Sequence, residues 1–169
     1  LRAPAVAVIA KPNDGKDTAI AAITNTLADP ADQVRASAMA SIAVLAARGN
    51  APADLVRALT KTLTTGSWPD RRVAAIALGK LADKGDPAAL VKAATDSSSF
   101  VREAVAGALG ELPPATGLEA LLTLSRDEVA QVRAAAAQGL GRLKDERAAK
   151  RRGELTRDPD PIVRAAAGS

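Results

Sequence analysis

A short motif recurs along this chain at nearly constant intervals, and this repeat constrains the fold more than any other feature. In its fullest copies, Val and Arg are followed by small residues and then by Leu seven and ten positions after the Arg. The marker arginines are Arg2, Arg35, Arg71, Arg102, Arg133 and Arg164, with successive spacings of 33, 36, 31, 31 and 31 residues. Periods of about 20–50 residues are typical of stacked repeat architectures, so we expect a row of similar units.

Each unit is predicted to contain two helices. The second helix, B, begins near the marker arginine, because apolar residues follow that arginine at helical spacing. The first helix, A, is less regular, and proline or aspartate precedes several of its copies. The expected A helices are Thr18–Leu27, Asp54–Leu63, Ala88–Ala94, Gly117–Leu124 and approximately Glu146–Leu155. No segment shows the alternation that is typical of a strand.

The predicted fold is therefore all-α, a stack of helix pairs that spans residues 1–169 as one domain. A single helix pair cannot bury its apolar face, whereas stacked pairs share a continuous core. The approximate units are 1–15 (partial), 16–49, 50–84, 85–113, 114–144 and 145–169 (partial). Because both end units are partial, we expect the chain to be a fragment of a longer protein.

The amino-acid composition excludes several kinds of catalytic and metal-binding site. The chain has 41 Ala, one Trp, one Phe and no Tyr, Cys or His. Without Cys and His, it can form neither a disulfide nor a Cys/His zinc site, and neither a Ser-His-Asp nor a Cys-His catalytic centre. It shows no phosphate-binding Gly-rich loop, no apolar run of membrane-spanning length and no signal-peptide pattern. We expect a protein without enzymatic activity, metal or cofactor.

Aspartates accompany most of the marker arginines. Asp29, Asp96, Asp127 and Asp158 each precede by six residues one of the arginines Arg35, Arg102, Arg133 and Arg164. An aspartate there can accept hydrogen bonds from amides at the start of a helix, or a bidentate contact from an arginine of its own or the adjacent unit. We expect these residues to form a structural ladder along the stack.

One copy departs from this pattern. Thr65 stands where the aspartate before Arg71 is expected, and Asp70 replaces the Val of the motif. The residues around Arg71 therefore do not predict a ladder contact there.

The combined motif Asp-x5-Arg and Val-Arg-x-x-Ala-x-x-Ala-Leu-Gly-x-Leu resembles HEAT repeats, specifically the short bacterial HEAT-like type first named from phycobilisome lyase subunits. The resemblance covers nearly the whole chain. It implies a right-handed, armadillo-like α-solenoid (α-α superhelix) whose B helices line the concave side and whose Asp–Arg ladder is structural. It also implies one function, because some members of the family assist the covalent attachment of a chromophore to a protein.

Variable residues form a stripe on the B helices, at positions one, five and nine after the marker arginine. Such positions lie along one face of a helix, and the concave surface of a solenoid is its natural binding surface. The candidate partner-binding residues of this stripe are Arg72, Ile76, Lys80, Glu103, Glu111, Gln138 and Arg142. Their mixed charge favours a protein or peptide partner over a polyanion, although an ordinary solvated face is equally compatible with the pattern.

The 36-residue spacing places extra residues in the turn before Arg71, and this turn holds the only Trp, Trp68. A lone Trp on a lengthened turn can anchor a partner. The alternative is that the indole folds back over helix ends and that Pro69 begins the next helix.

A basic segment spans residues 144–157, with six basic and three acidic residues. Its candidate anion-binding residues are Lys150, Arg151, Arg152 and Arg157. Nucleic acid is not the favoured partner, because no aromatic residues are interspersed among these basic residues to stack on nucleobases. The alternative is a solvated helix in which Arg151 and Arg152, at apolar positions of the repeat, extend past the core.

Three functions follow from the sequence. The leading one is a non-enzymatic protein–protein interaction scaffold that binds a protein or peptide on the concave B-helix face. The second is an accessory or lyase-like subunit that acts on a chromophore-bearing protein. The third is binding of nucleic acid or another polyanion through the basic segment.

Overall fold

The computed structural model describes residues 22, 26, 29–47 and 53–169, and all the regular elements in these ranges are helical. The helices are α3 (Asp32–Ala47), α4 (Ala53–Thr65), α5 (Trp68–Lys80), α6 (Pro87–Ala93), α7 (Ser99–Leu109), α8 (Pro114–Leu124), α9 (Ala130–Arg142), α10 (Glu146–Leu155) and α11 (Pro161–Gly168), with a short 3₁₀ turn, η2 (Ala82–Lys84). The predicted partial unit 1–15 lies outside the described residues, as does nearly all of the predicted helix Thr18–Leu27.

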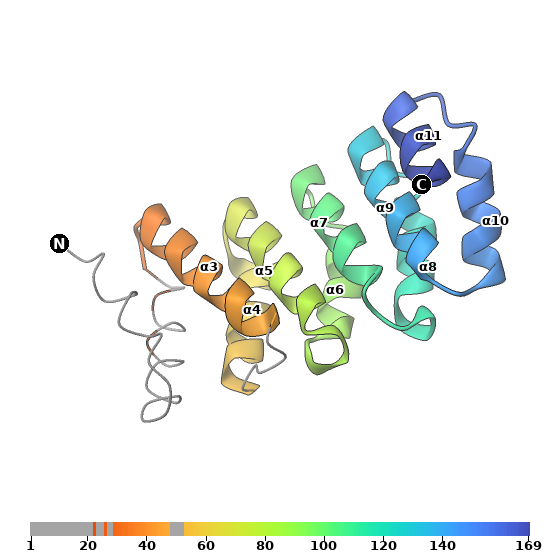
Figure 1. Cartoon of the computed structure of the whole chain (residues 1–169). Coiled ribbons are helices and arrows are strands. Elements are labelled where there is room, and N and C mark those ends of the chain that lie inside the picture. The colour runs from red at the N-terminus through yellow and green to blue at the C-terminus, as the bar shows by residue number, and fades with distance from the viewer. Residues whose placement is uncertain (1–21, 23–25, 27–28, 48–52) are drawn as a thin grey trace.

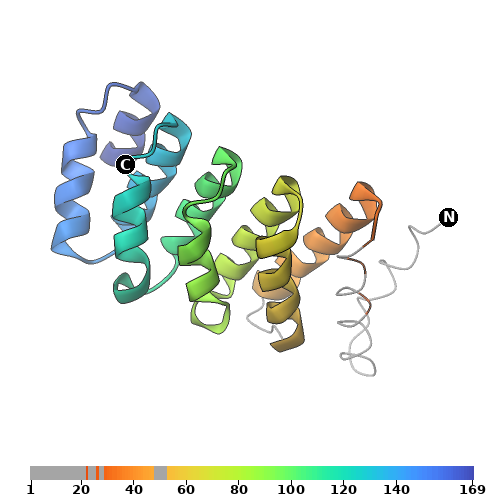
Figure 2. The same ribbon diagram turned by 180° about the vertical axis from the view of Figure 1, so that it is seen from behind.

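The helices form two layers. Helices α3, α5, α7, α9 and α11 lie side by side in one layer, which faces the viewer in Figure 1. Helices α4, α6, α8 and α10 form the second layer, which faces the viewer in Figure 2. We call these the B layer and the A layer, after the two helices of each unit. This arrangement confirms the predicted α-solenoid.

Most of the described helices begin with a local signal in the sequence. Proline occupies the first turn of α5, α6, α8 and α11, where its fixed φ suits a helix and its missing N–H removes no bond. Aspartate side chains cap α6, α10 and α11 by accepting hydrogen bonds from backbone amides. The acceptors are Asp86 (from the amide of Ala89, 3.0 Å), Asp145 (from that of Arg147, 2.8 Å) and Asp160 (from that of Ile162, 2.8 Å). These prolines and aspartates therefore determine where the helices of successive units begin.

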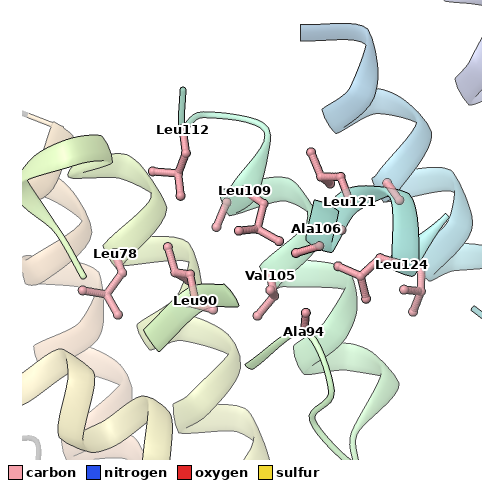
Figure 3. Close-up of a cluster of buried hydrophobic side chains, with 14 of the residues drawn as sticks. Leu78, Leu90, Ala94, Val105, Ala106, Leu109, Leu112, Leu121 and Leu124 are labelled. Carbon is pink, nitrogen blue, oxygen red and sulfur yellow. The ribbon is translucent and has the colours of Figure 1, made fainter. Parts of the chain in front are cut away.

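The core lies between the two layers and is built from Leu, Val and Ala. Leu78 and Leu109, seven residues after their marker arginines, are fully buried. They meet A-layer side chains such as Leu90 and Leu121, which are also fully buried (Figure 3). Each unit contributes the same positions, so the core continues from one unit to the next.

Glycines let the B helices approach one another closely. A Cβ placed on Gly79 of α5 would lie 2.5 Å from the Cβ of Ala108 on α7. A Cβ placed on Gly110, the C-cap of α7, would lie 2.6 Å from the Cα of Gly139 on α9. These distances are shorter than any real Cβ contact, so a side chain at either position would push neighbouring helices apart.

Candidate functional site

The B-layer stripe predicted from the sequence lies largely on the surface. Most of its residues are exposed, namely Arg72, Ile76, Lys80, Glu111, Gln138 and Arg142, while Glu103 is half-buried. They belong to α5, α7 and α9 or to the turn that follows α7, and these three helices are neighbours in Figure 1. The stripe residues therefore share one face of the molecule.

The charges on this face are only partly paired. The Nη1 atom of Arg142 lies 3.1 Å from the Oε1 atom of Glu111, which joins α9 to the end of α7. Arg72, Lys80 and Glu103 form no ion pair with any residue that the structure describes. Three charged groups on two adjacent helices are thus available to a partner.

The two aromatic residues of the chain stack on each other beside this face. Trp68 is the first residue of α5 and Phe100 is the second residue of α7. Their ring centroids are 4.9 Å apart and the rings are inclined by 25°. Trp68 is 46% exposed and Phe100 is 54% exposed, although large aromatic side chains are usually mostly buried. The indole thus reaches the start of the next B helix but stays open to solvent, and Pro69 occupies the first turn of α5.

The marker arginines form a ladder that connects adjacent units. In three successive units, the arginine donates from Nε and Nη2 to the two carboxylate oxygens of the aspartate 25 residues later. The distances are 2.8 and 2.8 Å for Arg71–Asp96, 2.7 and 3.0 Å for Arg102–Asp127, and 2.9 and 2.9 Å for Arg133–Asp158. This bidentate geometry suits the planar guanidinium group.

The aspartate of the same unit contributes its backbone carbonyl rather than its carboxylate. Arg102 donates from Nη1 to the carbonyl oxygen of Asp96 at 2.9 Å, and Arg133 donates to that of Asp127 at 2.9 Å. Arg164 makes the same contact with Asp158 at 2.8 Å. Of the two arrangements that the sequence left open, the carboxylate contact is thus the one between adjacent units.

The prediction that Arg71 lacks a ladder contact was wrong, because each marker arginine contacts the carboxylate of the following unit rather than that of its own unit. Arg71 needs an aspartate in the following unit, Asp96, and not one at position 65. The missing aspartate affects Arg35 instead. The Nε atom of Arg35 donates to Oδ2 of Asp70 at 2.9 Å, so Asp70 takes the role that Thr65 cannot fill.

The ladder aspartates have lowered pKa values. Burial by itself raises the pKa of Asp127, but hydrogen bonds from Arg102 and from the amide of Val129 outweigh it and leave the pKa below its ordinary value. The same holds for Asp96, where Arg71 and the amide of Ser98 donate. In Asp158 the hydrogen bond from Arg133 is the largest cause of the lowered pKa. These carboxylates are therefore charged partners of the arginines rather than candidate proton donors.

The sequence model for HEAT repeats matches this chain over residues 20–110, 56–131 and 87–169. The chain belongs to the HEAT-repeat family. No curated protein sequence matches it significantly. The matched ranges include every helix described above, so the helix pairs are HEAT repeats.

Solved structures with the same fold include natural and designed repeat proteins. In the complex of CpcE and CpcF of phycocyanin lyase from Nostoc sp. PCC7120, one chain is 26% identical with a TM-score of 0.71, and the match covers 91% of this chain and 100% of that chain. A designed armadillo repeat protein in complex with peptide (KR)4 is 18% identical with a TM-score of 0.62, over 89% of this chain and 80% of that chain. Human deoxyhypusine hydroxylase is 22% identical with a TM-score of 0.57, over 91% of this chain and 61% of that chain.

The basic segment of these HEAT repeats is divided among several contacts. Arg151 donates from Nε to Oγ of Ser125 at 2.8 Å and from Nη1 to Oε2 of Glu154 at 2.9 Å. Arg152 turns toward the B layer instead, where its guanidinium lies against Gly141 and its Nε is buried without a hydrogen bond.

Lys150 and Arg157 are exposed. Of the four candidate anion-binding residues, Arg151 and Arg152 thus contact different elements, and Lys150 and Arg157 face solvent.

Sequence reasoning missed Phe100. Phe100 precedes Arg102 by two residues, and Trp68 precedes Arg71 by three. Aligning the repeats would have placed both residues at the start of adjacent B helices. The repeat register was therefore the available signal.

The described part of the chain lacks a cluster of metal-ligating side chains. It contains no group of three or more carboxylate, imidazole or thiol side chains that could hold a metal ion. None of its helices combines the length and apolar character needed to cross a bilayer. The B-layer face presents charged side chains without ion pairs among the described residues and an exposed aromatic pair.

Proposed function

We propose that this HEAT-repeat chain is a non-enzymatic scaffold that binds a protein or peptide through the B-layer face of α5, α7 and α9. The observation that carries the proposal is the set of unpaired charges on adjacent helices, Arg72 and Lys80 on α5 and Glu103 on α7. Charged groups of both signs, beside an exposed aromatic pair, provide the polar and apolar parts of a protein interface.

The solved neighbours support this proposal at the level of the fold. The CpcE–CpcF structure is a complex between two proteins, and the designed armadillo protein is held in complex with a peptide. Solenoids present extended surfaces formed by successive units, and these surfaces suit macromolecules better than small substrates. We propose the same use for this chain, on the surface that its unpaired side chains identify.

A capture experiment tests the proposal. The chain serves as bait, with and without nuclease, and captured proteins are identified by mass spectrometry. Binding of a purified partner is then measured for the double variant Arg72→Ala/Glu103→Ala and for Lys92→Ala/Glu146→Ala. The control removes one exposed base and one exposed acid from the A layer, so the change in net charge is the same.

We expect the B-layer variant alone to lose affinity, about tenfold or more, with an unchanged melting temperature. Equal affinity of both variants for a verified partner would overturn the proposed site. Capture that disappears after nuclease treatment would instead support the basic segment as a nucleic-acid site, with an affinity that falls steeply as salt rises.

A second function is favoured by one specific observation, the match with the phycocyanin lyase structure over the full length of that chain. An accessory subunit for chromophore attachment needs no nucleophile of its own. Mixing the chain with a bilin and an acceptor protein would then change the visible absorbance spectrum. An unchanged spectrum, with the partner protein of the capture experiment also present, would count against this function.

A further inference from the structure

Adjacent B helices carry opposite charges at equivalent positions. Along α5, a basic, an apolar and a basic side chain follow at intervals of one turn. One repeat later, α7 and the turn after it present an acidic residue, a glycine and an acidic residue. The two rows are Arg72, Ile76 and Lys80, and Glu103, Gly107 and Glu111.

Gly107 leaves the middle of the α7 row open. A Cβ at this position would meet no atom within 4 Å, unlike one at Gly110 on the same helix end. On the two sides, Ile76 of α5 is 37% exposed and Gln138 of α9 is exposed. Packing therefore does not require this glycine, although glycine weakens a helix. The space into which a Gly107 side chain would project is therefore open, and we call this space the hollow.

One of the two acidic residues that flank Gly107 has no ion-pair partner among the described residues. Glu103 lies one turn before Gly107, is half-buried and has no ion-pair partner among the described residues. The acidic residue nine positions after the marker arginine does have a partner, because Glu111 lies 3.1 Å from Arg142 of α9. Arg72, at the equivalent position of α5, forms no ion pair with Glu103. A cation that enters the hollow would supply the partner that Glu103 lacks.

We propose that α5 and α7 together bind an extended segment of a partner protein that carries an acidic side chain and, three residues away, a basic side chain. The acidic side chain lies over Ile76, between Arg72 and Lys80. The basic side chain enters the hollow over Gly107, beside Glu103. This inference rests on the proposed function and names the chemistry of its partner.

The spacing of three residues follows from the distance between the helices. Packed helices are about 8–10 Å apart. A polyproline II segment rises about 3.1 Å per residue with three residues per turn, so side chains three apart are about 9 Å apart and point the same way. In a β-strand, side chains on one face are about 7 Å or about 13 Å apart, and neither distance matches the separation of two packed helices. The partner segment is therefore expected in the polyproline II conformation.

The opposite charges of the two rows also disfavour partner segments that carry only one sign of charge. A polyanion would meet Glu103 on α7 and Glu111 in the turn after it, and a purely basic peptide would meet Arg72 and Lys80 on α5. Each would gain contacts on one helix and repulsion on the other. A segment with both signs at the right spacing gains on both helices.

Peptide titrations observed by NMR test the inference. Proline-rich peptides place one Glu and one Arg two, three or four residues apart, in both orders, because the argument determines spacing and not direction. The full ¹⁵N-labelled chain is titrated with each peptide, and the amide resonance of Gly107 is followed. The indole resonance of Trp68, the only Trp, reports binding elsewhere on the same helices.

We expect the three-residue spacing to bind about tenfold more tightly than the other two spacings, because only that spacing makes both charged contacts at once. Equal affinity for all spacings, or an unmoved Gly107 resonance at millimolar peptide, would overturn the inference. Tighter binding of an all-basic or all-acidic peptide would do so as well.

Two variants of one residue separate binding from folding. Gly107→Arg fills the hollow with a cation next to Glu103, so it should raise the melting temperature and weaken the best peptide about tenfold or more. Gly107→Ala should raise the melting temperature and keep the binding. Peptide affinity that is the same in Gly107→Arg as in the natural chain contradicts the inference.

The failures of the two proposals are distinguishable. If a verified partner still binds both Gly107→Arg and Arg72→Ala/Glu103→Ala, the proposed function of this face is wrong. If that partner loses affinity while the peptides show no preference for a spacing, only the inferred partner chemistry is wrong.

Discussion

Individual arginines of this chain differ in what they contact rather than in charge. The side chain of Arg102 is 13% exposed and donates to both carboxylate oxygens of Asp127, whereas Arg72 is exposed and has no described ion pair. A partly buried carboxylate that loses its partner keeps the cost of its desolvation, while a solvated side chain loses almost nothing. Arg102 therefore has a structural contact, whereas Arg72 is left for the partner that we propose.

This difference predicts the stability of two single variants. Arg102→Ala should lower the free energy of unfolding by about 1–3 kcal/mol, because Asp127 is left unpaired next to the core. Arg72→Ala should leave it within about 0.5 kcal/mol of the natural chain. Thermal or urea unfolding measures both. Equal stabilities of the two variants would contradict the structural role of the ladder.

At the scale of helices, the glycines of α7 show that the same residue has two different uses. Gly110 lies where a Cβ would meet the backbone of α9, so it allows the two helices to touch. Gly107 faces open space, so it has no such role. Both have helical backbone angles, and neither is required by a left-handed turn. Packing between helices, not local conformation, separates them.

The two glycines predict opposite effects of one substitution. Gly110→Ala should destabilise the chain by about 1–3 kcal/mol, because the added methyl group forces α7 and α9 apart. Gly107→Ala should stabilise it by about 0.5–1 kcal/mol, through the lower conformational entropy of Ala in the unfolded chain. Urea unfolding of both variants is the measurement. A stabilising Gly110→Ala would show that the B helices can separate at little cost.

Across the whole molecule, the ladder links each described unit to the next. Asp96, Asp127 and Asp158 all have pKa values below the ordinary range, and each receives two hydrogen bonds from the preceding unit. In a solenoid each unit contacts only its neighbours, so these contacts add to the stability of every interface they cross.

The ladder predicts how stability depends on pH. In the unfolded chain an aspartate has a pKa of about 3.9, and in the folded chain the pKa values of these three aspartates are lower. Between the two pKa values the unfolded chain binds more protons, so stability rises with pH there. The contribution is complete above about pH 5 and is lost as the pH falls through the folded pKa values.

Thermal unfolding between pH 2 and pH 7 checks this dependence, with Asp127→Asn as the comparison. The variant should be less stable at neutral pH, and its difference from the natural chain should shrink as the pH falls below about 4. A difference that stays constant over the whole range would mean that the charge of Asp127 does not matter.

The sequence by itself determined the repeat, the helix pairs and the identity of the core residues. Their signals are local, namely the helical spacing of Leu and Ala, the prolines of the first turns and the aspartate caps. The stripe of Arg72, Glu103 and their neighbours was also predictable, because a position on a helix face follows from spacing alone.

Tertiary structure decided which residues of different units meet. Sequence spacing gave equal support to an arginine contact within a unit and one between units, and the stacking of units places Asp96 at Arg71 and Asp70 at Arg35. The same offset brings Phe100 to Trp68 and turns Arg152 toward Gly141. These contacts depend on how far one helix pair is shifted against the next. That shift is set by the closest approach of glycines and alanines across the whole interface, which no single repeat contains.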